Sequence, residues 1–436
     1  MRGRAIRRPV AVTPVPGSRT TSDLPHEAEL PDLICGVRMG LLMKRRGFLA
    51  SAASLALVGC GSQTSPSADD AAPGENLGLR HARYLTLERH DGFILARMKA
   101  PVADQSGGQV EERSDLVVLA PRDGPEPRLP AALAHATVVR TPVARIASNA
   151  ASDEAFLGQL EAKDRLVAVG GLGSYDDEIR DAVVAGRIGQ IGYNWHSPPN
   201  LDVLLASRPD VFLMRLSDLA HTPVLDRARA LGLTVVPTFA EDEPSYLGRA
   251  EWVRLYGVLT GREAEADRLF NGIEQRVTSL KSAAAARPQS PVLWAYPNGG
   301  DRWVATVRGA EASYLSDAGG RNLLQRAEDA RKWSSETLST EQILPVADKA
   351  EVWIIGDMHM APPRSTAVEA ASPAFRNDRL FSNTGRTNPR TDAYDWYQLA
   401  LVRPDWVLAD FVKAIHPDLV DEPFRYLKPV PRGVYR

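Results

Sequence analysis

One long helical pattern near the middle of the chain constrains the fold more than any other feature. Residues Glu263–Ala286 contain no proline, and the pair Arg287-Pro288 ends the pattern. About 24 residues in an α-helix would span roughly 36 Å. The apolar residues of this stretch recur at the spacing of one helix face: Leu269, Phe270, Ile273, Val277 and Leu280. The stretch therefore predicts a single long helix with one buried face.

Short apolar runs alternate with helical patterns on both sides of this helix. Before it, "RLVAVGG" at 165–171 is typical of a buried strand, and Asp176–Val184 is typical of a helix. After it, "PVLWAYP" at 291–297 begins a second set of the same kind. Such alternation favours parallel sheets. The sequence therefore predicts an α/β protein with two doubly wound α/β lobes joined by one long helix, and the cleft between lobes is the default ligand site.

The region before the first lobe has a different, β-rich pattern. Strand-forming runs occupy 83–120, and Asp91-Gly92 between the first two is a hairpin signal. A small N-terminal β-meander is therefore predicted. The expected boundaries are 81–136 for this β-rich extension, 137–262 for the N-terminal lobe, 263–287 for the linking helix and 288–436 for the C-terminal lobe.

Residues 1–59 are predicted to be a signal region. The apolar run Phe48–Val58 would span about 16 Å as a helix, which is too short for a bilayer core of about 30 Å. Basic residues precede it, and Arg45-Arg46 resembles a twin-arginine export signal. Residues 1–38 are interpreted as an upstream misassignment of the start codon, or as a long leading segment of the signal.

The end of the apolar run, "LVGC" at 57–60, resembles a bacterial lipobox. Cys60 is therefore the expected lipidation site and the first mature residue. Residues 60–80 are small and polar, which predicts a flexible tether. A lipid and a tether together would hold a folded body beside a membrane.

Composition and motifs exclude several other classes of protein. The formal net charge is −2, so bulk charge gives no support for nucleic-acid binding. Two cysteines cannot build a disulfide framework or a cysteine-based zinc site. Gly171 and Gly173 lack the third glycine of a dinucleotide fingerprint, and common hydrolase and P-loop motifs are missing. No catalytic residue, metal site or resident cofactor is predicted, although an exported twin-arginine-dependent enzyme on a related two-lobe scaffold stays open.

Four further stretches follow one another in a characteristic order: "NLDVLLASRPDVFLM" (200–214), "PVLDRARALGLTVV" (223–236), "YLGRAEWVRLYGVLTGREAEADRL" (246–269) and "ALVRPDWVLADFVKAIHP" (400–417). After a lipobox, this order resembles the helical-backbone (class III) periplasmic binding proteins. These are the substrate-binding subunits of ABC importers for iron–siderophores, haem and cobalamin. The resemblance covers roughly residues 140–417.

The resemblance implies a function, partners and a location. It implies a monomeric substrate-binding protein that captures a metal chelate, of which a ferric siderophore fits best, with haem and cobalamin as further options. The chelate would pass to an ABC permease dimer with its ATPase. The protein would lie on the periplasmic or cell-surface face of the cytoplasmic membrane, held by its lipid anchor only.

The resemblance also implies two residues that dock on the permease. Each lobe of such proteins presents one acidic residue to permease arginines, and the matching positions here are Asp202 and Glu341. Asp202 is one methylene shorter than the family's glutamate. Both residues also fit the ordinary role of an acid at a helix N-terminus, so that alternative stays open.

Residues after the predicted strands are the candidates for ligand binding, because strand ends should line the cleft. Aromatic side chains suit a flat or bulky ligand, and an arginine suits carboxylate or catecholate oxygens. Packing within a lobe core is the alternative for each aromatic residue. The candidates are Ser148, Asn149, Tyr175, Tyr193, Trp195, His196, Tyr296, Trp303, His359 and Arg386.

Overall fold

The computed structural model describes residues 74–104, 108–195, 198–329, 334–356, 368 and 371–430. The chain divides into two units, Met1–Gln63 and Thr64–Arg436, and all described residues belong to the second. The predicted signal region, Cys60 and most of the tether lie outside the described residues. Within the described part of the chain, no helix is both long and apolar enough to span a bilayer.

The β-rich extension forms a sheet of its own. Its strands lie in the order β1-β2-β3-β4-β5. The strands are β1 (Glu75–Asn76), β2 (Leu85–His90), β3 (Phe93–Ala103), β4 (Val110–Pro121) and β5 (Thr137–Thr141). The first four are antiparallel, as expected of a meander, whereas β5 is parallel to β4. The sheet thus continues past residue 136, where the sequence placed its end, because β5 pairs with a strand that lies well before it in the chain.

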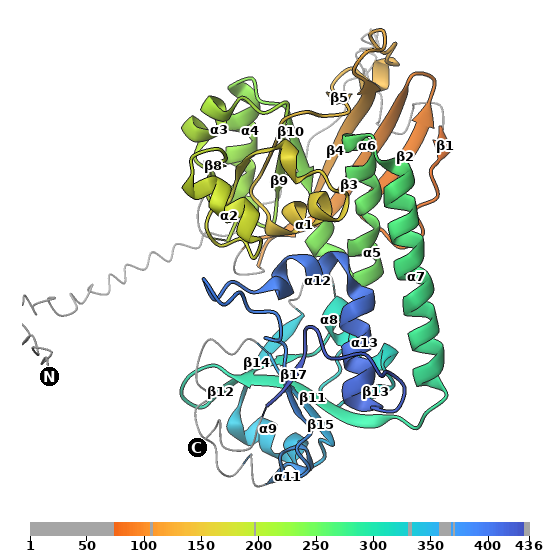
Figure 1. The fold of residues 1–436 in the computed structure, drawn as a ribbon, viewed down its shortest axis with the longest axis vertical. Helices are drawn as coiled ribbons and strands as arrows, with labels where there is room; N and C mark the ends of the chain where they lie inside the picture. The colour runs from red at the N-terminus through yellow and green to blue at the C-terminus, as the bar shows by residue number, and fades with distance from the viewer. Residues whose placement is uncertain are drawn as a thin grey trace, which may run out of the picture. The chain divides into compact units, whose positions relative to one another are not determined.

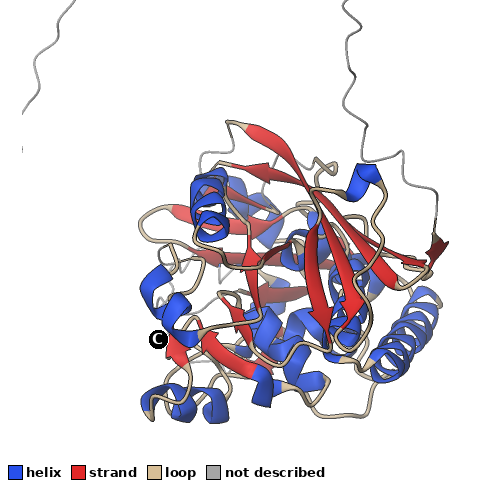
Figure 2. Ribbon diagram, turned by 90° about the horizontal axis from the view of Figure 1, so that it is seen from above, coloured by secondary structure: helices blue, strands red, loops and turns tan. Residues whose placement is uncertain are grey.

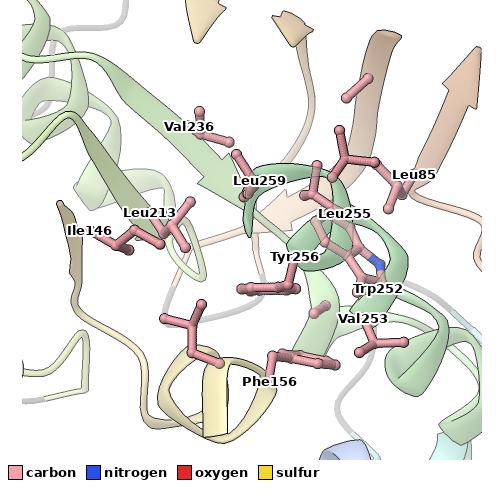
Figure 3. Close-up of a cluster of buried hydrophobic side chains, with 14 of the residues drawn as sticks. Leu85, Ile146, Phe156, Leu213, Val236, Trp252, Val253, Leu255, Tyr256 and Leu259 are labelled. Atoms are coloured by element: carbon pink, nitrogen blue, oxygen red, sulfur yellow. The ribbon is translucent and has the colours of Figure 1, made fainter. Parts of the chain in front are cut away.

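The extension shares a core with the N-terminal lobe. Leu85 of β2 belongs to the same buried cluster as Ile146, Phe156, Trp252 and Leu255. Figure 3 shows these side chains converging from strands and helices of both parts. The extension is therefore an integral layer of the N-terminal lobe.

The N-terminal lobe contains a fully parallel sheet in the order β10-β9-β6-β7-β8. Its strands are β6 (Ile146–Ser148), β7 (Leu166–Val169), β8 (Gly189–Gln190), β9 (Val211–Arg215) and β10 (Val235–Thr238). Its helices are α1 (Ala151–Gln159), α2 (Asp177–Val184), α3 (Leu201–Ser207), α4 (Thr222–Ala230), α5 (Tyr246–Glu251) and α6 (Val253–Thr260). Strand order reverses at β6, and ligands bind beside such switch points in open α/β sheets.

Helix α7 (Glu263–Ala285) joins the two lobes, as the periodicity predicts. Phe270 belongs to the core of the N-terminal lobe, whereas Ile273 and Val277 belong to the core of the C-terminal lobe. The helix packs on α6 at one end and on α8 (Gly309–Asp317) and α13 (Pro404–Ile415) at the other (Figure 1). One apolar helix face therefore serves both cores.

The C-terminal lobe has a mixed sheet, in the order β14-β12-β11-β15-β16-β17, with β13 beside β11. The strands are β11 (Ser290–Pro297), β12 (Arg302–Thr306), β13 (Gly320–Asn322), β14 (Ser335–Ser339), β15 (Val352–Ile355), β16 (Leu380–Ser382) and β17 (Lys428–Pro429). Strands β12, β14 and β17 are antiparallel to their neighbours, so this sheet is less regular than the expected doubly wound sheet. Helices surround the sheets (Figure 2), which gives the predicted mixed α/β class.

The remaining elements of the chain are short. The further helices of the C-terminal lobe are α9 (Thr340–Ala347), α11 (Pro373–Arg376) and α12 (Leu399–Val402). The 3-10 helices are η2 (Ala131–Leu133), η3 (Lys163–Arg165), η4 (Leu219–His221), η5 (Ala240–Asp242) and η6 (Asp395–Tyr397).

Residues 386–403 form what we call the cross-lobe arm. The arm follows β16 but packs, through α12, on α1 and α5 of the N-terminal lobe. The sequence assigned it to the C-terminal lobe on chain order alone. The arm therefore joins the two lobes in addition to α7 and to the packing of α5 on α8 and α13.

Candidate functional site

Three of the predicted N-lobe residues lie at the carboxyl ends of the parallel strands, but inside the lobe. The Ser148 hydroxyl donates to Asp153 over 2.7 Å, and the backbone N–H of Arg215 donates to Asn149 Oδ1 over 2.8 Å. The Tyr193 hydroxyl donates to Glu154 over 2.9 Å. All three side chains are buried. Their polar atoms therefore support the strand-end loops.

Trp195 lies on the surface above this layer. Its ring stacks on Tyr193 with 4.3 Å between ring centroids and is half exposed. Gly170 makes room for the stack, because a Cβ there would lie 2.0 Å from the Tyr193 ring. Leu172 and Tyr397 are also nearly half exposed, on segments that are joined by a hydrogen bond from Gln398 to Ser174. The strand ends thus expose apolar and aromatic groups.

A pocket of about 480 Å³ lies between α1, the start of α2 and the cross-lobe arm. It combines residues of both lobes: Glu154, Ala155, Gly158, Gln159, Lys163, Tyr175, Asp176, Asp177, Glu178, Arg386, Asn388, Pro389, Asp395, Gln398 and Leu399. Two predicted site residues, Tyr175 and Arg386, are among them. The volume is in the range of roughly 300–1,000 Å³ that small-molecule sites occupy.

The guanidinium of Arg386 is enclosed by its neighbours. It forms an ion pair with buried Asp395, and it lies 5.1 Å from the ring centroid of Tyr175 and 5.6 Å from that of Tyr426. Burial raises the pKa of Asp395, although Arg386 opposes the shift. The backbone N–H of Leu399 also donates to Asp395 over 3.0 Å. Arg386 is therefore fixed at the pocket wall with a counter-charge in place.

The opposite wall holds a second ion-paired cation. Lys163 Nζ lies 2.8 Å from Asp176 Oδ2 and 2.6 Å from Glu178 Oε2. Asp176 is also the N-cap of α2, because its other oxygen accepts from the backbone N–H groups of Glu178 and Ile179. The start of α2 is thereby tied to the end of α1.

Two buried carboxyl groups beneath the pocket are features that the sequence did not single out. Asp153 accepts from the hydroxyls of Ser148 and Tyr256, and Glu154 accepts from Ser174, Tyr193 and Gln398. Burial raises the pKa of Asp153 to about 7 and that of Glu154 to about 8, while these hydrogen bonds oppose the shifts. Acidic residues in the first turn of a helix are usually exposed. In the sequence, only the apolar residues around Asp153 and Glu154 indicated that these carboxyl groups would be buried.

The remaining cleft candidates are dispersed. Tyr296 is half-buried, and Trp303 is buried in the C-terminal core with its Nε1 donating to Thr340 Oγ1 over 3.0 Å. His196 and His359 lie outside the described residues. Among the residues that the structure describes, no group of three or more histidine, cysteine or acidic side chains is arranged to hold a metal ion.

The two predicted docking acids are exposed in the first turns of α3 and α9. Asn200 supplies the N-cap of α3, and Ser339 with Gln342 forms a capping box on α9. The caps therefore come from neighbouring residues, and both carboxylates face solvent. Asp202 and Glu341 do lie in the first turn of their helices, so the ordinary role of an acid at a helix N-terminus stays open beside the docking role.

The family described as periplasmic binding proteins matches residues 146–385. Two curated relatives are uncharacterized lipoproteins of Methanocaldococcus jannaschii. One is 24% identical over 56% of this chain and 56% of its own length, and the other is 21% identical over 52% and 58%. The chain thus spans little more than half the length of these relatives. The extension sheet β1–β5 precedes the matched range.

Solved structures of similar proteins include a periplasmic haem-binding protein from Pseudomonas aeruginosa. It is 19% identical with a TM-score of 0.49, over 66% of this chain and 98% of that one. A periplasmic vitamin B12 binding protein of Vibrio cholerae is 17% identical with a TM-score of 0.44, over 63% of this chain and 96% of that one.

Proposed function

Because the chain belongs to the periplasmic binding protein family, we propose that it is the lipid-anchored substrate-binding protein of an ABC importer. It captures a metal chelate between its lobes and delivers the chelate to a permease dimer with its ATPase. An iron–siderophore complex is the leading ligand, and haem and cobalamin are the other members of the class.

The observation that carries the proposal is the pocket shared by both lobes. Tyr175 and Lys163 come from the N-terminal lobe, whereas Arg386 and Asp395 come from the cross-lobe arm. A ligand in this pocket would contact both lobes at once, so binding would favour their closed arrangement. The exposed aromatic groups Trp195 and Tyr397 offer further contact area near the strand ends.

Ligand titration tests the proposal. Purified mature protein is titrated with a ferric trihydroxamate, a ferric triscatecholate, haem and cobalamin, and binding is followed by calorimetry and tryptophan fluorescence. We expect saturable binding of at least one of them. If the protein binds none of the four, the proposal is wrong.

A pocket-filling variant locates the binding site. Gly158→Trp places a large ring in the pocket, and a Cβ at this position makes only an ordinary contact of 3.6 Å with Lys163. We expect at least tenfold weaker binding. Gly272→Trp on α7 is the matched control, because a Cβ there meets no atom within 4 Å. Equal affinities of the two variants would place the ligand elsewhere.

Docking on the permease is proposed for Asp202 and Glu341. One carboxylate on each lobe would let two permease subunits hold both lobes at once through charge-assisted pairs. The double variant Asp202→Lys/Glu341→Lys should lose uptake but keep its ligand affinity. Asp226→Lys/Asp348→Lys, at two other exposed acids of the same lobes, is the control for charge. Uptake that is equal in both double variants would contradict the docking role.

Anchoring is proposed for Cys60. The curated relatives are lipoproteins by description, which supports the lipobox interpretation. Cys60→Ala should move the protein from the membrane fraction to the soluble fraction of cells. A variant that stays in the membrane fraction would contradict the lipid anchor.

A further inference from the structure

The charges of the inter-lobe pocket restrict the ligand more closely than the family does. The lining contains two cations, Lys163 and Arg386. It contains more carboxyl groups: Glu154, Asp176, Asp177, Glu178 and Asp395. Both cations contact carboxylates from the same lining, so neither presents an uncompensated positive charge to a ligand.

Arginines just outside the lining reduce the excess of carboxylates without reversing it. Arg180 and Arg390 both contact Asp177, and Arg390 also contacts Asp181 over 2.9 Å. With these neighbours included, and with Glu154 left aside as a protonated group, five carboxylates still face four cations. The surroundings of the pocket are therefore balanced or slightly negative.

Arg386 is poorly placed to receive an anion. Arg386 is paired through its Nε with buried Asp395, so an incoming carboxylate or catecholate would meet a guanidinium whose charge is already compensated. Removing one partner of a buried pair is costly because it leaves the other charge uncompensated. The rings of Tyr175 and Tyr426 lie near the guanidinium as well. The sequence predicts that Arg386 binds carboxylate or catecholate oxygens, and the Asp395 counter-charge would weaken such binding.

We propose that the pocket selects a chelate of zero or positive net charge and rejects polyanionic chelates. The inference rests on the proposed function, since it assigns the ligand to the same pocket. Like-charge contacts and the ion-paired arginine would raise the free energy of a bound polyanion, and this is how a site discriminates against a wrong ligand. A neutral or cationic complex of similar shape meets neither obstacle.

A series of ferric complexes of graded charge tests the inference. The probes are a neutral ferric trihydroxamate, an analogue that carries one free ammonium group, and a trianionic ferric triscatecholate. At low salt we expect dissociation constants at least tenfold lower for the first two. The difference should shrink as salt rises, because ions screen the carboxylates. Equal or tighter binding of the triscatecholate overturns the inference while leaving the proposed function intact, whereas failure of all chelates, haem and cobalamin to bind overturns both.

Two variants probe the charges directly. Asp395→Asn removes the counter-charge of Arg386, so triscatecholate binding should improve severalfold and trihydroxamate binding should not. Because Asp395 is buried and this variant could fold poorly, Glu178→Gln is the second test: its side chain is 75% exposed, and its loss releases one contact of Lys163. Glu161→Gln, at an 89% exposed carboxylate outside the lining, is the control. If Glu178→Gln and Glu161→Gln give the same affinities for the triscatecholate, the inference is wrong.

Discussion

Two of the connections between the lobes are built from different interactions. Helix α7 is joined by apolar packing, with Phe270 fully buried in one core and Val277 in the other. The cross-lobe arm combines apolar packing, with Val402 fully buried in the N-terminal core, with polar contacts at its outer end, where the ion pairs of Arg390 are about half exposed. Apolar packing of this kind is lost only when a core is opened, whereas water can replace exposed hydrogen bonds at little cost. The difference indicates that the outer, polar end of the arm is easier to separate from the N-terminal lobe than α7 is.

Within the N-terminal lobe, the extension is fastened by what we call the amide clamp. The Glu251 carboxylate accepts three consecutive backbone N–H groups, from Arg80, His81 and Ala82, at 2.6–3.0 Å. Glu243 accepts the next two in the same way. Both carboxylates are almost completely buried. The clamp therefore fixes the start of the extension beside α5 and α7.

The arm lies on the α1–α2 corner of the N-terminal lobe. Asn388 Nδ2 donates to the Tyr175 carbonyl and to Asp177 over 2.9 Å each, and Gln398 Oε1 accepts the Tyr175 N–H over 2.8 Å. Arg390 pairs with Asp181, and both side chains are about half exposed. These contacts border the pocket. The arm contacts therefore help to shape one side of the pocket.

The largest expected effect comes from the apolar connection. Phe270→Ala would leave a cavity where α7 meets the N-terminal core, and such substitutions cost about 3–5 kcal/mol of unfolding free energy. Urea denaturation measures the loss. Gln275→Ala, on the exposed face of the same helix, should change stability by less than about 0.5 kcal/mol. Similar losses in both variants would mean that the α7 face does not carry the connection.

The amide clamp should have the next largest effect. Glu251→Ala leaves buried N–H donors unpaired, and each such donor costs roughly 1–3 kcal/mol. Part of this cost is recovered if water enters, so a total loss of about 2–3 kcal/mol is expected. Glu265→Ala removes a largely exposed glutamate from α7 and serves as the control. If Glu251→Ala is no less stable than the control, the clamp contributes little to holding the extension on the N-terminal lobe.

The pH dependence of stability tests the point where the arm meets the buried carboxyl groups. The folded-state pKa of Glu154, about 8, is above the ordinary glutamate value of 4.5, so the folded protein binds the proton more tightly than the unfolded chain does. Its contribution to stability is therefore complete below about pH 4.5 and is lost as the pH rises through about 8. The free energy of unfolding should decrease over this interval.

Glu154→Gln isolates this contribution. Asp153 still titrates in the variant, with a pKa raised to about 7, so the slope of stability against pH should become shallower and its magnitude should decrease steadily between pH 7 and 8. Wild type and variant are compared by urea denaturation at several pH values. A variant with an unchanged slope would show that Glu154 is not the titrating group.

Local patterns predicted one connection and missed the other. Helix α7 follows from its own periodicity, and Arg287-Pro288 places its end within two residues of the observed one. The pairing of β5 with β4 and the packing of α12 on α1 join segments far apart in the chain. No local periodicity reports such contacts, so the boundary at 137 and the position of the arm could not be predicted.

The same limit applies to the candidate site. Tyr175 and Arg386 were predicted because they follow strands, and both line the pocket. Lys163 and Glu154 were missed because their partners, Asp176 and Gln398, come from other segments. The sequence also could not show that Arg386 is paired with Asp395. The residue types of the site can be predicted, whereas their pairing requires the fold.

The smallest effect on stability, and the sharpest test of a separable arm, is expected from Arg390→Ala. Exposed ion pairs contribute little to stability, so the thermal midpoint should stay within experimental error of the wild type. The separation of the lobes should nevertheless change, because the variant removes the ion pairs of the arm with Asp177 and Asp181. Spin labels at Val184→Cys and Asp348→Cys, exposed positions on different lobes, report the distance distribution. The distribution should broaden toward longer distances in the variant. The wild-type distribution should broaden in the same way as added salt screens the ion pairs of Arg390.

The control is Arg268→Ala, which removes an exposed ion pair on α7 and should leave the distance distribution unchanged. If added salt shifts the distance distributions of the wild type and of Arg390→Ala equally, the ion pairs of Arg390 do not hold the arm. The polar contacts that hold it would then be the buried hydrogen bonds of Gln398.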